Sequence, residues 1–82
     1  MNKCFVCGES LGLHRHHLLG GCRRTTSEKY GLVVYLCFTH HDIVTNEKDR
    51  ELTESLHRYA QLKFQKEHPE LDFMKTFNKN YL

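Results

Sequence analysis

Two short stretches decide the fold of this chain: Cys4-Phe5-Val6-Cys7, and Leu32-Val33-Val34-Tyr35-Leu36-Cys37-Phe38-Thr39-His40. The first is typical of a knuckle, a tight turn that directs two thiolates to one point. The second begins with β-branched and aromatic residues, which predict a strand over 32–37. Each stretch carries two ligands separated by two residues, a spacing that lets both side chains reach one tetrahedral Zn²⁺. The sequence therefore predicts a structural zinc site with four protein ligands: Cys4, Cys7, Cys37 and His40.

Two alternatives stay open for these residues. Reduced thiols can pack as small hydrophobic groups, which would make His40 incidental. Cys22 could also replace His40 as the fourth ligand, or remain a free thiol.

The size of the chain explains why a metal would be needed. It has 82 residues, of which 39% are hydrophobic and none is Trp, and a core this thin rarely stabilises a domain alone. Residues 1–10 lack the apolar stretch of a signal peptide, and no segment approaches the ~20 apolar residues of a membrane span. We therefore expect an intracellular protein without a membrane partner, whose cysteines bind metal rather than form disulfides.

The remaining pattern predicts an α+β domain. Residues 11–19 are compatible with a strand or an extended segment, and the loop that follows is expected to run from Gly20 through Thr26. Ser27 is a candidate N-cap of a single short turn that ends at Gly31. Apolar residues at helical spacing predict a long helix over 47–67 and a shorter one over 70–77. A thin core and exposed C-terminal aromatics would also favour a homodimer.

Histidines outside the zinc site are the best candidates for function. His16 and His17 are adjacent on the extended segment, and His41 directly follows the zinc pair. Neighbouring side chains of a strand point to opposite faces, so His16 and His17 should take different roles unless a bulge re-aims one of them. One imidazole could act as a base, and a divalent metal on His16 and His41 could stabilise the leaving oxygen of a phosphodiester.

Charge places a phosphate-binding surface in the same half of the chain. The net charge is only +2, but residues 1–41 carry five Lys or Arg against two acids, whereas residues 42–82 carry seven against eight. Cations contact the anionic backbone of nucleic acids. The candidates for that contact are Arg15, Arg23, Arg24 and Lys29.

The order of these motifs resembles the HNH endonuclease family of the zinc-knuckle kind. The matching parts are Cys4-Phe5-Val6-Cys7, His16-His17-Leu18-Leu19-Gly20-Gly21 and Leu36-Cys37-Phe38-Thr39-His40-His41. The segments Ser27-Glu28-Lys29-Tyr30-Gly31-Leu32 and Asp72-Phe73-Met74-Lys75-Thr76-Phe77 are similar to small HNH-like proteins of phages and prophages.

The resemblance implies a small zinc-stapled ββα-metal domain over residues 1–46, with a helical extension over 47–82 formed by a long helix and a short final one. It also implies a DNA hydrolase in the cytoplasm of a bacterial host. His17 would be the general base, and His16 and His41 would hold Mg²⁺, Mn²⁺ or another divalent ion.

Two departures from the family pattern support other functions. No Asn lies between His17 and His41, and Thr45 occupies the position where many members have a further metal ligand. One alternative is therefore an HNH-fold phage protein that has lost catalysis and binds a host defence nuclease or DNA. A plain zinc-ribbon DNA-binding module is the other alternative.

Overall fold

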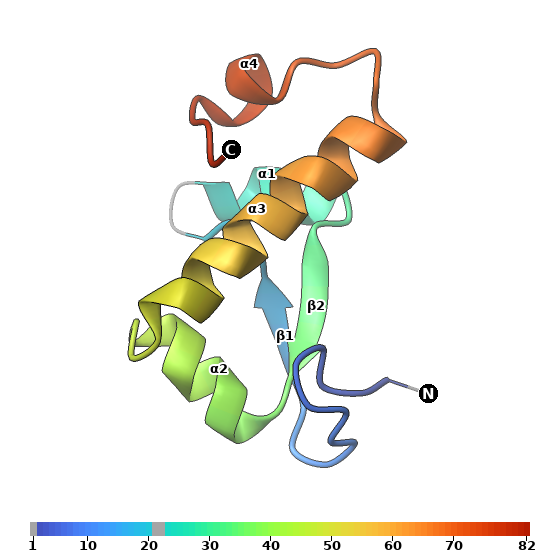
Figure 1. The fold of residues 1–82 in the computed structure, drawn as a ribbon. Coiled ribbons are helices and arrows are strands. Elements are labelled where there is room, and N and C mark those ends of the chain that lie inside the picture. The colour runs from blue at the N-terminus through green and yellow to red at the C-terminus, as the bar shows by residue number, and fades with distance from the viewer. Residues whose placement is uncertain (1, 21–22) are drawn as a thin grey trace.

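The computed structural model describes residues 2–20 and 23–82 as an α+β domain with a two-stranded antiparallel sheet and surrounding helices (Figure 1). The order of elements in these residues is β1 (His14–His17), α1 (Arg24–Lys29), β2 (Val33–Leu36), α2 (Phe38–Thr45), α3 (Arg50–Glu67) and α4 (Phe73–Phe77). Figure 1 shows α3 crossing the hairpin, with α2 toward one end and α4 toward the other. The α+β prediction and both strands are confirmed.

The register of the hairpin determines which histidines share a face. His14 pairs with Leu36 and His16 with Val34. Directly opposed residues of an antiparallel pair lie on the same face of the sheet, and both Leu36 and Val34 are buried. His14 and His16 are therefore on the face that carries the core. The intervening Arg15, together with His17, lies on the other face.

The chain between β2 and the long helix differs from the prediction. The sequence pattern indicated a helix from residue 47, whereas α2 already forms at Phe38 and ends at Thr45. Glu47 then adopts a left-handed conformation with φ of 51°, which breaks the helix there. The helix α3 begins only at Arg50, after Asp49, whose side chain accepts a hydrogen bond from the N–H of Leu52 and so caps the helix.

The prediction for Ser27 is wrong. Ser27 is inside α1 rather than at its N-cap, and the helix starts at Arg24, within the segment expected to be a loop. The Ser27 side chain is fully buried. Its hydroxyl donates to the carbonyl of Leu32 at 2.7 Å and accepts from the N–H of Leu19 at 3.4 Å. Ser27 therefore joins the end of β1 to the start of β2.

The core joins residues 1–46 to residues 47–82. Phe64 of α3 is fully buried, and its ring contacts those of Tyr30, Phe73 and Phe77 at centroid distances of 5.2, 5.4 and 5.5 Å. The short final helix begins at Phe73 rather than at residue 70, after the capping side chain of Asp72. Phe73 and Phe77 are 2% and 3% exposed. The expectation of exposed C-terminal aromatics is therefore wrong for both residues, which removes one of the two reasons given for a homodimer.

Candidate functional site

The four predicted zinc ligands lie together. The ligand atoms of Cys4, Cys7, Cys37 and His40 all lie within 4.8 Å of one another. The Cys7 and Cys37 sulfurs are 3.8 Å apart, and the Nδ1 atom of His40 lies 3.2 Å from the Cys37 sulfur. Tetrahedral zinc with Zn–S and Zn–N bonds of about 2.3 and 2.0 Å separates two sulfurs by about 3.8 Å and a sulfur from a nitrogen by about 3.5 Å. The cluster could therefore bind a metal ion such as zinc.

Local backbone geometry brings the two ligand pairs together. The N–H of Gly8 donates to the carbonyl of Cys4 at 2.9 Å and closes the knuckle. Gly8 has a φ of +82° there, which glycine adopts without steric cost. The N–H of Phe5 donates to the carbonyl of Tyr35 at 2.8 Å, which ties the knuckle to β2. Cys37 and His40 follow from the junction of β2 and α2.

Electrostatics favour a thiolate at Cys4. Burial opposes the ionisation of this thiol, but backbone N–H groups of Cys37, Cys7 and Val6 outweigh it and lower the Cys4 pKa from 9.0 to about 6. The thiolate is the form that binds metals. Cys22, the alternative fourth ligand, lies outside the described residues.

The second predicted pair, His16 and His41, also comes together. His41 in α2 lies edge-to-face against His16 with ring centroids 5.5 Å apart, and it stacks on His14 at 4.7 Å. We call His14, His16 and His41 the three-histidine cluster. Within the described part of the chain, only the Cys4, Cys7, Cys37 and His40 group has three or more ligand atoms already gathered. The three imidazoles are therefore neighbours whose nitrogens do not yet converge.

Burial favours the neutral form of two members of this cluster, His16 and His41. Burial of His16, together with the nearby His41, His17 and His57, lowers its pKa from 6.5 to about 4. Burial and the neighbouring His14 also lower the pKa of His41. Neutral imidazole is the form that binds a metal ion.

His17 lies on the other face of β1 and has a different partner. Its Nε2 atom is 2.7 Å from a carboxylate oxygen of Glu28 in α1, and Arg15 pairs with the same oxygen. Hydrogen bonds from Arg15 and His17 lower the pKa of Glu28 to about 2. An ionised carboxylate only accepts hydrogen bonds, so the Nε2 atom of His17 carries the proton of this hydrogen bond. Glu28 was not predicted as a site residue, because only the formation of α1 brings it to His17.

The predicted phosphate contacts divide into two groups. Arg15 and Arg24 line a shallow hollow of about 490 Å³ together with His17, Thr25 and Glu28. Arg23 instead donates from its Nε to the carbonyl of Phe77 at 2.9 Å, and Lys29 lies 5.4 Å from the centre of the Tyr30 ring. Arg23 is thus attached to the end of α4.

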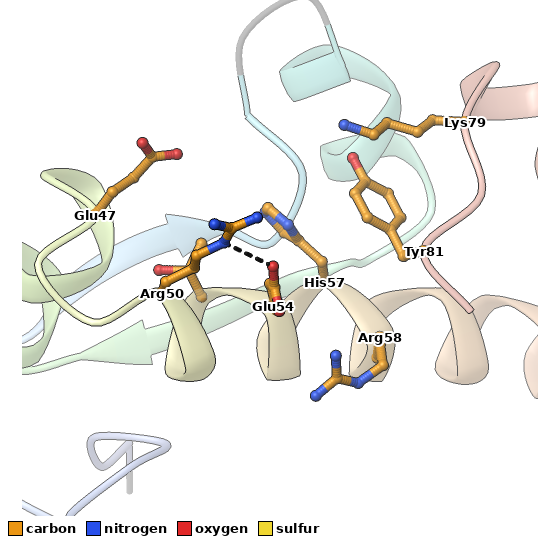
Figure 2. A pocket seen from close by; sticks show the side chains of 8 residues that line it. Glu47, Arg50, Glu54, His57, Arg58, Lys79 and Tyr81 are labelled. Atoms are coloured by element: carbon orange, nitrogen blue, oxygen red, sulfur yellow. Dashed lines mark hydrogen bonds and ion pairs between the residues drawn. The ribbon is translucent and has the colours of Figure 1, made fainter.

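A larger hollow of about 690 Å³ lies between α3 and the C-terminal tail (Figure 2). His57 of α3 lines it and contacts Tyr81 with ring centroids 4.7 Å apart. Burial and nearby Lys79 lower the pKa of His57, and His57 in turn contributes to the lowered pKa of His16. His57 is therefore an electrostatic link between the lining of this hollow and His16. The complete lining is Glu47, Arg50, Thr53, Glu54, His57, Arg58, Lys79 and Tyr81.

None of the helices in residues 2–20 and 23–82 has the length and apolarity that crossing a membrane requires. Compared with family models, with curated proteins and with solved structures, the chain matches none of them.

Proposed function

We propose that this chain is a metal-dependent endonuclease of the HNH type that hydrolyses phosphodiester bonds in DNA. The observation that carries the proposal is the approach of His16 on β1 to His41 on α2, with ring centroids 5.5 Å apart. The hairpin followed by a helix, with a Cys3His cluster at their junction, is the arrangement that the family resemblance implies.

The residues of the cluster suit a divalent ion. Burial lowers the pKa of both His16 and His41, which favours the neutral imidazole that binds metal ions. A divalent ion held there would stabilise the negative charge that develops on the phosphate and the leaving oxygen.

His17 would accept the proton of the attacking water. Glu28 holds the Nε2–H of His17 at 2.7 Å, so the neutral ring would present the Nδ1 lone pair as the basic atom. A carboxylate that fixes the tautomer and orientation of a histidine in this way is a common support for a general base. The side chains of Arg15 and Arg24, which border the same hollow, would hold the DNA backbone.

The second hollow extends this surface. Arg50, Arg58 and Lys79 give its lining three cations against the two carboxylates of Glu47 and Glu54. In Figure 2, Arg50 and Lys79 approach the hollow from opposite sides, with His57 between them. A phosphate of the DNA strand adjoining the three-histidine cluster would meet these cations.

Plasmid nicking tests the proposal. Zinc-loaded protein incubated with supercoiled plasmid and Mg²⁺, Mn²⁺ or Ni²⁺ should produce the open circular form. His41→Ala and His17→Ala should both abolish nicking, whereas His68→Ala, a histidine at the end of α3, should not. Absence of nicking with all three metals, or nicking that survives His41→Ala, would refute the proposal.

One observation favours a second function, DNA binding without cleavage. His17 and His16 point to opposite faces of β1, so a base at His17 and a metal at His16 share one phosphodiester only if the end of β1 turns. If the chain is a binding protein, His16→Ala and His17→Ala will leave DNA affinity unchanged in a gel-shift assay. Binding that weakens steeply with salt would identify phosphate contacts. Capture of one stoichiometric nuclease from host lysate, with no DNA binding, would instead identify a protein inhibitor.

A further inference from the structure

We propose that His14 is the third ligand of the metal site at His16 and His41, and that this site takes a transition-metal ion rather than Mg²⁺. The inference rests on the metal-binding part of the proposed function and not on catalysis. Thr45 occupies the position where many members of the family have a further metal ligand. In this chain, His14 would supply that ligand from β1 instead of from α2.

The positions of the three rings carry the proposal. His14 and His16 are two residues apart on β1 and therefore share a face. His41 lies against both, with centroid distances of 4.7 and 5.5 Å. Two imidazoles bound to one tetrahedral ion through metal–nitrogen bonds of 2.0–2.1 Å have ring centres about 5 Å apart. The observed separations lie on either side of that value, so His14 and His16 both lie at about the distance from His41 that a shared ion requires.

The change that binding does require is a rotation of rings. The His14 and His41 rings are nearly parallel, with an angle of 6° between their planes, and parallel stacked rings do not direct their nitrogens to one point. His14 is exposed, so its ring has room to turn about the Cβ–Cγ bond. Turning it toward His41 would bring a third nitrogen to the ion.

The donor set determines which metal fits. The nearest acid in sequence, Asp42, is already engaged by Lys48 at 2.7 Å and by Asn46 at 2.6 Å. The three-histidine cluster thus offers imidazoles without a free carboxylate from α2. Imidazole suits Zn²⁺, Ni²⁺, Co²⁺ and Cu²⁺, whereas Mg²⁺ requires oxygen ligands. Three protein ligands also leave an open coordination position, as catalytic zinc sites do.

Cobalt titration of the full chain with its structural zinc in place tests the inference. Co²⁺ bound to imidazoles gives visible d–d bands without the thiolate charge-transfer band that would mark replacement of zinc at the cysteines. Wild-type protein should bind one Co²⁺ in this way, and excess Mg²⁺ should not displace it. His14→Ala should weaken Co²⁺ binding at least roughly tenfold, because even the loss of an outer-shell partner costs that much. His14→Gln, which keeps the bulk of the side chain, should do the same.

The controls separate this inference from the nuclease proposal. His68→Ala should bind Co²⁺ like wild type, and the far-UV circular dichroism and zinc content should be unchanged in every variant. Wild-type affinity in His14→Ala, no second ion in the wild type, or displacement by Mg²⁺ would each overturn the inference. Co²⁺ binding that depends on His14 without plasmid nicking would sustain the site and refute the nuclease. Nicking with Mg²⁺ that is insensitive to His14→Ala would do the reverse.

Discussion

Two groups of residues include a histidine from the first turn of α2. His40 belongs to the group with Cys4, Cys7 and Cys37, called the zinc cluster here, and His41 belongs to the three-histidine cluster. The two groups differ in how far they are assembled. The four ligand atoms of the zinc cluster already lie within 4.8 Å of one another, whereas the rings of His14 and His41 are stacked. Each half of the zinc cluster is built within one short turn of the chain. The three-histidine cluster depends on strand register, helix packing and ring rotation together. The comparison teaches that a group built within short turns of the chain is gathered by local geometry, whereas a group built from a strand and a helix depends on how the two elements pack.

The largest effect should come from removing a ligand of the zinc cluster or the metal ion itself. Cys37→Ser, or a strong chelator added to the wild type, should abolish most of the helical far-UV circular dichroism. Structural zinc contributes about 10–16 kcal/mol in zinc-finger peptides, which is as large as the entire stability of a typical domain at about 5–15 kcal/mol. His41→Ala should keep the spectrum. A folded Cys37→Ser protein would contradict this prediction, because it would show that the fold does not depend on the zinc cluster.

The next largest effect should come from removing a buried aromatic ring from the core. Phe64→Ala should lower the free energy of unfolding by about 3–5 kcal/mol in urea denaturation of zinc-loaded protein, because Phe64 is fully buried among Tyr30, Phe73 and Phe77. Leu62→Ala is the matched control on the same helix, since Leu62 is 55% exposed. An equal loss in both variants would show that α3 does not anchor the core.

The hydroxyl that joins the two strands should have an intermediate effect. Ser27→Ala should destabilise the protein by about 1–3 kcal/mol, because the N–H of Leu19 then loses its partner in a buried place. Ser55→Ala, on the exposed surface of α3, is the control for replacing a serine in a helix. If Ser27→Ala also weakens Co²⁺ binding, the register of β1 controls the three-histidine cluster.

The smallest effect is a pH dependence on the face of β1 away from that cluster. Glu28 has a pKa of about 2 in the folded protein against an ordinary 4.5. Its contribution to stability is therefore present above about pH 4.5 and is lost as the pH falls toward 2. Glu28→Gln should be slightly less stable than wild type at pH 6, and the difference should shrink on acidification to pH 2. Stability curves that stay parallel across this range would show that Glu28 is not paired with Arg15 and His17 in solution.

The zinc cluster and the strands could be predicted because their signals are local. Two-residue spacing between ligands and the β-branched run over 32–37 depend on few neighbours. The same holds for the aromatic and aliphatic spacing that predicted α3, although its start was placed three residues early. The reason is that the capping side chain of Asp49 and the left-handed Glu47 determine the start of α3, and the apolar spacing carries neither.

The rest of the site depends on contacts between distant residues. Glu28 reaches His17 because α1 folds back over the hairpin, and Ser27 became buried for the same reason. His57 joins the neighbourhood of His16 only through the packing of α3. His14 was not among the predicted site residues, because its contact with His41 follows from the register that pairs it with Leu36. No spacing rule within one segment carries such information.

The hydrogen bond from Phe5 to the carbonyl of Tyr35 covers part of the outer edge of β2. In a sheet with two strands, that edge would otherwise expose unpaired backbone groups to other chains. An ion shared by the cysteines of the knuckle with Cys37 and His40 would hold the knuckle in this position. Loss of the metal would therefore uncover a strand edge as well as the thiols, and the demetallated protein should aggregate through β-pairing between molecules rather than remain a soluble unfolded monomer.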